Sequence, residues 1–249
     1  MTFVTLKKQD GVGILTISRG NVNPINEKFV DELTVAFKTI EKDKEINSVI
    51  LTGYGKFFSF GFDIPEFLSY SKENFSGYVK KFTELYTLIF TFSKPVIASL
   101  NGHTMAGGCM LAMACDYRIM ASGKSKISLN ELTFGATVLA GSVEMLRFIV
   151  GNANSSKILY SGKMYSSQEA KEMGLIDEVA ELEDLTSISL EKAKDLGDRS
   201  SEAFHSIKKL IRKPVAEEMK KREIESIKEF VEIWYSSSTQ ENLKKITIN

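Results

Sequence analysis

The fold is decided by residues 95–121, PVIASLNGHTMAGGCMLAMACDYRIMA. Pro95 ends a preceding helical pattern, and the apolar run 96–100 is typical of a buried strand. A glycine-containing turn follows at 101–108, then an apolar helix, and the pattern at 116–121 indicates another strand. Strand, helix and strand in such close succession predict an α/β protein.

The alternation of strands and helices extends through the first two thirds of the chain. It predicts a hairpin of strands 3–6 and 12–18, followed by a helix that starts at Asn23-Pro24. A strand at 48–52, a tight loop at 53–67 and a helix at 72–92 come next. A capped helix is predicted from Ser166 to Gly174. From about Leu185 onward the sequence is helical and strongly charged. We therefore expect an α/β core at residues 1–195 and a C-terminal helical region at residues 196–249.

Composition excludes several classes of partner. The 249 residues include 32 Lys plus Arg and 32 Asp plus Glu, so no overall field attracts nucleic acid or an anionic membrane. Two cysteines, Cys109 and Cys115, and two histidines, His103 and His205, are a poor supply of metal ligands, and we expect neither a metal nor a disulfide. No apolar run has the length of a membrane span and the first residues lack a signal-peptide profile, which predicts a cytoplasmic protein.

Two short loops at strand ends, 59–63 and 105–108, lie where α/β proteins usually build their sites. The pair Gly107-Gly108 would open a helix, whose first N–H groups have no partners and lie at the positive end of the helix dipole. A negative oxygen is stabilised there. Alternatively, the two glycines serve only to let the helix approach a strand closely.

Three segments in order resemble a known family. They are SVILTGYGKFFSFGFDIPEF at 48–67, the stretch at 95–121, and SGKMYSSQEAKEMGLIDEV at 161–179. Together they resemble the crotonase superfamily of enoyl-CoA hydratases and isomerases, over about residues 3–215. The resemblance implies a spiral of repeated ββα units with a C-terminal helical trimerisation region, assembled as a homotrimer or as a hexamer of two trimers. It also implies acyl-CoA thioester substrates, with coenzyme A as part of the substrate and no separate cofactor.

The shared chemistry of that family is the stabilisation of a thioester enolate by two backbone N–H groups. In this chain the matching amides are those of Phe62, within Gly61-Phe62-Asp63, and of Gly107. Fixed donors at a helix start need little reorganisation as charge develops on the carbonyl oxygen, which agrees with the interpretation of the glycine pair. The side chain of Phe62 is free to shape the acyl pocket.

The acid and base positions distinguish the branches of the family. Hydratases place two glutamates near the reacting carbons, and at the first of these positions this chain has Met110, whose thioether transfers no proton. At the second it has Glu131, within the sequence LNEL. A single carboxylate suffices to remove a proton from C2 and return it to C4, so the chain resembles the Δ3,Δ2-enoyl-CoA isomerase branch, as does its CDYR segment at 115–118. Burial should raise the pKa of Glu131 toward neutrality.

Other residues are weaker candidates. Glu144 is an auxiliary acid or a helix-dipole partner, and His103 beside the glycine turn is a less favoured base. Met110, Phe67 and Phe134 are expected to line the acyl pocket.

Three functional alternatives stay open at this point. Glu131 could instead cap a helix or face solvent. The same fold could carry hydration, or another enolate reaction such as thioester hydrolysis. In a different class of function, the scaffold could serve as a non-catalytic acyl-CoA-binding or assembly module, because a fold does not fix a function.

Overall fold

A computed structural model describes residues 2–248 and places a six-stranded sheet at the centre of the molecule, in the order β1-β2-β4-β7-β9-β12. The first two strands form the predicted antiparallel hairpin, and from β2 onward all neighbouring strands are parallel. The strands are β1 (Val4–Gln9), β2 (Val12–Ile17), β4 (Ser48–Gly53), β7 (Val96–Leu100), β9 (Tyr117–Ala121) and β12 (Glu178–Ala180).

Short strands form two smaller sheets beside the large one. A four-stranded sheet has the order β11-β10-β8-β5, and β3 pairs with β6 in parallel. Three successive strands of the large sheet, β4, β7 and β9, are each followed by a strand of the small sheet and then by a helix, which is the expected repeated ββα unit. The short strands are β3 (Pro24–Ile25), β5 (Phe57–Ser59), β6 (Gly61–Phe62), β8 (His103–Met105), β10 (Lys126–Ser128) and β11 (Tyr165–Ser166).

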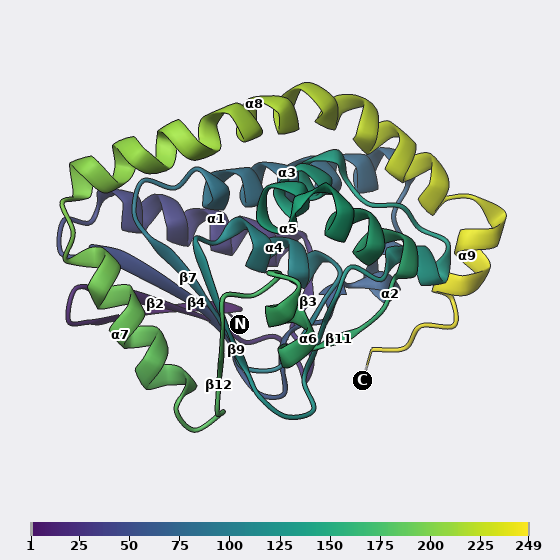
Figure 1. The fold of residues 1–249 in the computed structure, drawn as a ribbon. Coiled ribbons are helices and arrows are strands. Elements are labelled where there is room, and N and C mark those ends of the chain that lie inside the picture. Colours follow the sequence, from purple (N-terminus) through teal and green to yellow (C-terminus); the bar gives the residue numbers. More distant parts are fainter. Residues whose placement is uncertain (1, 249) are drawn as a thin grey trace.

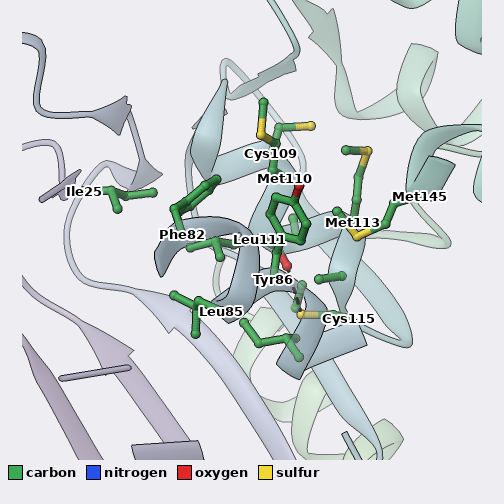
Figure 2. Close-up of a cluster of buried hydrophobic side chains, with 14 of the residues drawn as sticks. Ile25, Phe82, Leu85, Tyr86, Cys109, Met110, Leu111, Met113, Cys115 and Met145 are labelled. Carbon is green, nitrogen blue, oxygen red and sulfur yellow. Dashed lines mark hydrogen bonds between the residues drawn. The ribbon is translucent and has the colours of Figure 1, made fainter. Parts of the chain in front are cut away.

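Helices cover both faces of the large sheet (Figure 1). On one face lie α1 (Glu27–Lys42), α3 (Lys72–Phe90), α4 (Gly107–Ala114) and α5 (Ala140–Ser161), and on the other lies α7 (Leu185–Gly197). All eight residues of α4 are buried, so this helix is the centre of the core. Figure 2 shows Met110, Leu111 and Met113 of α4 among side chains from α3 and α5.

The C-terminal region is helical, as the charged sequence predicts. It contains α8 (Ser201–Trp234) and the short α9 (Ser237–Leu243). The long helix α8 arches over the layer of core helices and packs against α3 and α5 (Figure 1). Within residues 2–248, no helix combines the length and apolar composition that crossing a bilayer requires.

The structure corrects three local predictions. The expected loop at 53–67 instead contains β5, β6 and α2 (Ile64–Phe67). These elements are too short to leave a periodic pattern in the sequence. The first helix begins at Glu27 with Asn26 as its N-cap, because Pro24 belongs to β3. The long α5 was not predicted, since a non-helical Gly151 with φ of 74° interrupts its pattern.

A buried ionic cluster joins α8 to the core. The Arg212 guanidinium donates to the carbonyls of Phe90, Ala114 and Cys115, at 2.8–3.0 Å, where α3 and α4 end. Its Nη2 also lies 3.2 Å from the carboxylate of Asp116, which Lys208 contacts at 2.6 Å. The cation therefore satisfies carbonyls at helix ends where the dipole is negative.

We predict that Arg212→Met lowers the free energy of unfolding by about 3–5 kcal/mol, because it leaves three buried carbonyls without their donor and removes one of the two cations that contact the Asp116 carboxylate. Urea denaturation measures the change. The control is Lys213→Met on the same helix, whose side chain is 60% exposed and whose ion pair contributes roughly 0.5 kcal/mol or less. Equal losses in the two variants would contradict a structural role for the cluster.

Candidate active site

A cavity of about 310 Å³ lies where β6, the first turn of α4, the 3-10 helix η1 (Glu131–Phe134) and the end of α8 meet. Five of the residues selected from the sequence line it together: Phe62, Gly107, Met110, Glu131 and Phe134. The other lining residues are Phe60, Ile64, Met105, Ala106, Asn130, Thr133, Ala136, Phe230, Trp234 and Ile246.

The first turn of α4 presents backbone N–H groups at this cavity. The first intrahelical bond runs from the Met110 N–H to the Ala106 carbonyl at 3.0 Å, so the N–H groups of Gly107, Gly108 and Cys109 have no acceptor within the helix. Ala106 has φ of 46° and ψ of −117°, a strained conformation for a residue with a side chain. Such strain is typical of functional turns, and the helix end carries partial positive charge.

Strand β6 lies directly against this turn. A Cβ added at Gly61, where φ is 98°, would be 3.0 Å from the Cβ of Ala106 and 3.1 Å from the nitrogen of Gly107. The next residue but one, Asp63, donates its N–H to the Ile25 carbonyl of β3 at 2.9 Å. Because successive N–H groups of an extended strand alternate in direction, the N–H of Phe62 points away from β3.

The glycine pair of α4 also has the packing role that the sequence left open. A Cβ at Gly108 would lie 2.8 Å from both the Cβ and the carbonyl oxygen of Ser59, and one at Gly107 would lie 3.0 Å from the ring of Phe62. The two interpretations are therefore compatible. Close packing against β5 and β6 is what brings the helix start to the cavity.

Glu131 is a buried carboxyl group at the cavity wall, and only 4% of the residue is exposed. It does not face solvent, and neither carboxylate oxygen has a hydrogen-bond partner among the described residues. Burial raises its pKa from 4.5 to about 8, because the charged form loses its hydration. A carboxyl group with this pKa can accept and release a proton near neutral pH.

Two polar groups at the cavity were missed from the sequence. The Asn130 Oδ1 and the Trp234 Nε1 are both buried without a partner among the described residues. Asn130 is adjacent to the chosen glutamate and could have been proposed with it. Trp234 and its neighbour Phe230 come from the far end of the chain, and the one available signal was a lone tryptophan in a charged helix.

Three sequence candidates lie outside the cavity lining. Phe67 is fully buried behind the Phe62 ring, with centroids 5.9 Å apart. Glu144 forms ion pairs with Arg222 of α8 and with Arg147. His103 accepts a hydrogen bond from the Lys126 N–H at 3.3 Å and contacts the Phe57 ring at 4.9 Å.

Metal and thiol chemistry find little support in the described part of the chain. No cluster of three or more His, Cys, Asp or Glu residues there could hold a metal ion. The thiols of Cys109 and Cys115 are both buried in α4 and at its end, and neither forms a disulfide. Burial raises the pKa of both thiols, that of Cys115 to about 12.

We predict that Glu131→Gln becomes more stable than the unchanged protein as pH rises. With the native pKa near 8 and the reference value at 4.5, the native state holds a proton that the unfolded chain has lost between these two values. This contribution to stability is complete below about pH 4.5 and disappears as pH rises through 8. Between pH 4.5 and pH 9, the free energy of unfolding of the variant should rise relative to that of the unchanged protein by on the order of 5 kcal/mol.

Urea denaturation at pH 5, 7 and 9 measures this difference, with Thr133→Ser as a neutral substitution in the same wall. The control should follow the unchanged protein at every pH. A stability difference for Glu131→Gln that stays constant between pH 5 and 9 would contradict the raised pKa.

Known proteins resemble this chain over most of its length. A family model described as enoyl-CoA hydratase/isomerase matches residues 7–245. A mitochondrial enoyl-CoA hydratase of Pongo abelii is 31% identical over 194 residues, covering 78% of this chain and 66% of that protein. The mitochondrial enoyl-CoA delta isomerase 1 of Mus musculus is 29% identical over 238 residues, covering 94% of this chain and 81% of that protein.

The structure gives the same result as the sequence. The crystal structure of human mitochondrial delta3-delta2-enoyl-CoA isomerase superposes with a TM-score of 0.93 at 27% identity, covering 97% of this chain and 95% of the human one. Together with the repeated ββα units and the family model, this likeness establishes that the chain belongs to the crotonase superfamily, as an enzyme of the enoyl-CoA hydratase/isomerase family.

Proposed function

We propose that this enzyme is a Δ3,Δ2-enoyl-CoA isomerase, which moves the double bond of a 3-enoyl-CoA to position 2. One observation carries the proposal: among the described residues that line the cavity, Glu131 is the only one with an ionisable side chain. Isomerisation needs one group that first accepts and then returns a proton. A single carboxyl group with a pKa of about 8 meets that requirement.

The proposed reaction has two proton transfers. The Glu131 carboxylate removes a proton from C2, and the electron pair of the C–H bond passes into the conjugated system and onto the thioester oxygen. The resulting dienolate then takes the proton at C4 from the same carboxyl group, which leaves the double bond between C2 and C3. No atom is gained or lost, and Glu131 returns to its starting state.

We further propose that the N–H groups of Phe62 and Gly107 hold the thioester oxygen. The Gly107 N–H has no acceptor within its helix and lies at the positive end of α4, while the Phe62 N–H points away from β3. Donors fixed by packed backbone are already oriented before charge develops on the oxygen. The contact of Gly61 with the α4 turn supports this role for both residues.

Hydration is the second candidate, and it has one observation in its favour. The unpartnered Oδ1 of Asn130 could accept a hydrogen bond from a water molecule beside Glu131. A hydratase must also deliver a proton to the neighbouring carbon, and Met110 offers no such group. Glu144, the other acid considered, is paired with arginines outside the cavity. The geometry thus favours isomerisation.

A purely binding role would leave Glu131 unexplained. A buried carboxyl group without a partner costs stability, and a binding module gains nothing from it. Proteins retain such groups mainly where they serve chemistry.

We predict that Glu131→Gln lowers isomerase turnover of 3-hexenoyl-CoA by roughly a thousandfold, because general acid–base catalysis contributes about 10²–10⁴. Ultraviolet absorbance follows conjugation of the double bond, and a parallel sample of 2-enoyl-CoA detects water addition. Affinity for a saturated acyl-CoA should stay within about threefold, since the isosteric amide keeps the shape of the wall.

Glu144→Gln is the matched control, as the same substitution in an acid outside the cavity lining, and it should retain most of the turnover. Turnover of Glu131→Gln within tenfold of the unchanged enzyme would refute the proposed base. Hydration faster than isomerisation in the unchanged enzyme would favour the second candidate.

We also predict that kcat/KM for isomerisation rises with pH and levels off above about 8, since the base must be deprotonated in the free enzyme. Below that value the rate should change about tenfold per pH unit. Initial rates between pH 6 and 9.5 test this, with enzyme stability checked at each pH. A profile that is already flat from pH 6 would exclude a base with the raised pKa of Glu131.

A further inference from the structure

The cavity is open on one side and closed on the other. Among its lining residues, Thr133 is exposed and the partly exposed ones are Phe60, Ala106, Asn130, Phe134 and Ile246, so these mark the side that reaches the surface. The buried lining contains Glu131 and a group of large apolar side chains that are each less than one tenth exposed: Phe62, Ile64, Met110, Phe230 and Trp234. An acyl chain that enters from the surface therefore ends against an apolar wall.

The Phe62 ring is a part of this wall that lies close to the proposed thioester site. It lies against the start of α4, where a Cβ added at Gly107 would be 3.0 Å from its Cδ1 and 3.1 Å from its Cε1. Phe62 as a residue is 8% exposed, so most of its surface is in contact with other groups of the protein. A chain held at Gly107 must accordingly pass the ring or stop at it.

A layer of aromatic side chains behind Phe62 prevents the ring from moving back. Its centroid lies 4.9 Å from that of Phe82 and 5.1 Å from that of Tyr78, both in edge-on contacts. Phe67, Phe75, Tyr78 and Phe82 are all fully buried. Interiors packed at this density have no free volume for a ring to occupy, so the position of Phe62 is fixed from behind.

The α8 side chains fix the ring from another direction. The centroids of Phe230 and Trp234 lie 6.3 and 6.5 Å from that of Phe62. The Tyr235 hydroxyl donates to the Tyr70 carbonyl at 2.6 Å and attaches this end of α8 to the segment between α2 and α3. The wall therefore combines two parts of the chain that are held together.

We propose that the Phe62 side chain sets the length of the acyl group, and that the substrates are short-chain acyl-CoA thioesters. The ring stands beside the helix start that would hold the thioester oxygen, and the aromatic layer behind it leaves no space into which it could move. Only a short acyl chain therefore fits between the thioester site and the ring. The inference rests on the proposed acyl-CoA site and needs no assumption about the reaction that follows.

The test is the affinity of saturated butanoyl-, hexanoyl-, octanoyl- and decanoyl-CoA, measured by calorimetry. Each methylene that enters an apolar pocket strengthens binding about fourfold. In the unchanged protein we expect this increment up to about hexanoyl-CoA and none beyond. In Phe62→Ala the increment should continue, so that the ratio of decanoyl to hexanoyl affinity rises at least tenfold.

Phe62→Leu is the second variant, because it keeps more of the packing and carries the test if the alanine variant does not fold. In this variant the ratio of decanoyl-CoA to hexanoyl-CoA affinity should rise by at least fourfold. The matched control is Phe148→Leu, the same substitution at a residue of α5 that is 39% exposed and lies outside the cavity lining, and it should leave the ratio unchanged.

Two results would overturn the inference: full increments through decanoyl-CoA in the unchanged protein, or no difference between the folded Phe62 variants and Phe148→Leu. Saturated thioesters cannot isomerise, so the outcome is separate from the proposed function. The expected binding profile without turnover of any 3-enoyl-CoA would refute the isomerase and leave the inference intact. Isomerase activity together with a chain-length profile that the Phe62 variants do not alter would refute the inference and leave the proposed isomerase intact.

Discussion

The contact between Gly61 of β6 and the first turn of α4 is the constraint on which the cavity depends. The two stretches of backbone lie so close that a Cβ at Gly61 would be about 3 Å from Ala106 and Gly107, and the φ of 98° there also disfavours any residue but glycine. Two N–H groups from distant parts of the chain thereby line one cavity. Because β3 holds β6 in place and α4 is buried throughout, neither donor can move independently of the core.

Both ends of α4 are used, in opposite electrostatic senses. Its N-terminal amides lie at the cavity, at the positive end of the helix dipole, while its last carbonyls accept hydrogen bonds from Arg212. Arg212 belongs to α8, and the far end of α8 supplies Phe230 and Trp234 to the cavity wall. One long helix therefore binds the C-terminal end of α4 through Arg212 and completes the cavity wall with its last residues.

Sequence patterns predicted the parts of the site that depend on backbone motifs. Glycine turns at strand ends indicated the loops 59–63 and 105–108. The family resemblance selected Phe62, Gly107 and Glu131, and all three line the cavity. The α8 side chains could not be predicted, since their position depends on how a long helix crosses the core. Phe67 was expected in the lining, yet the direction of its side chain depends on the short α2 and turns it behind Phe62.

The thiols of Cys109 in α4 and of Cys115 at its end are natural probes of local unfolding in the core. Cys109 and Cys115 are fully buried with raised pKa values, so almost no thiolate is available to an alkylating reagent while α4 remains packed. Modification then requires the helix to separate from its neighbours. The rate of alkylation therefore measures how often α4 separates from the core. Because the proposed backbone donors lie on the same helix, it also measures how often their orientation is lost.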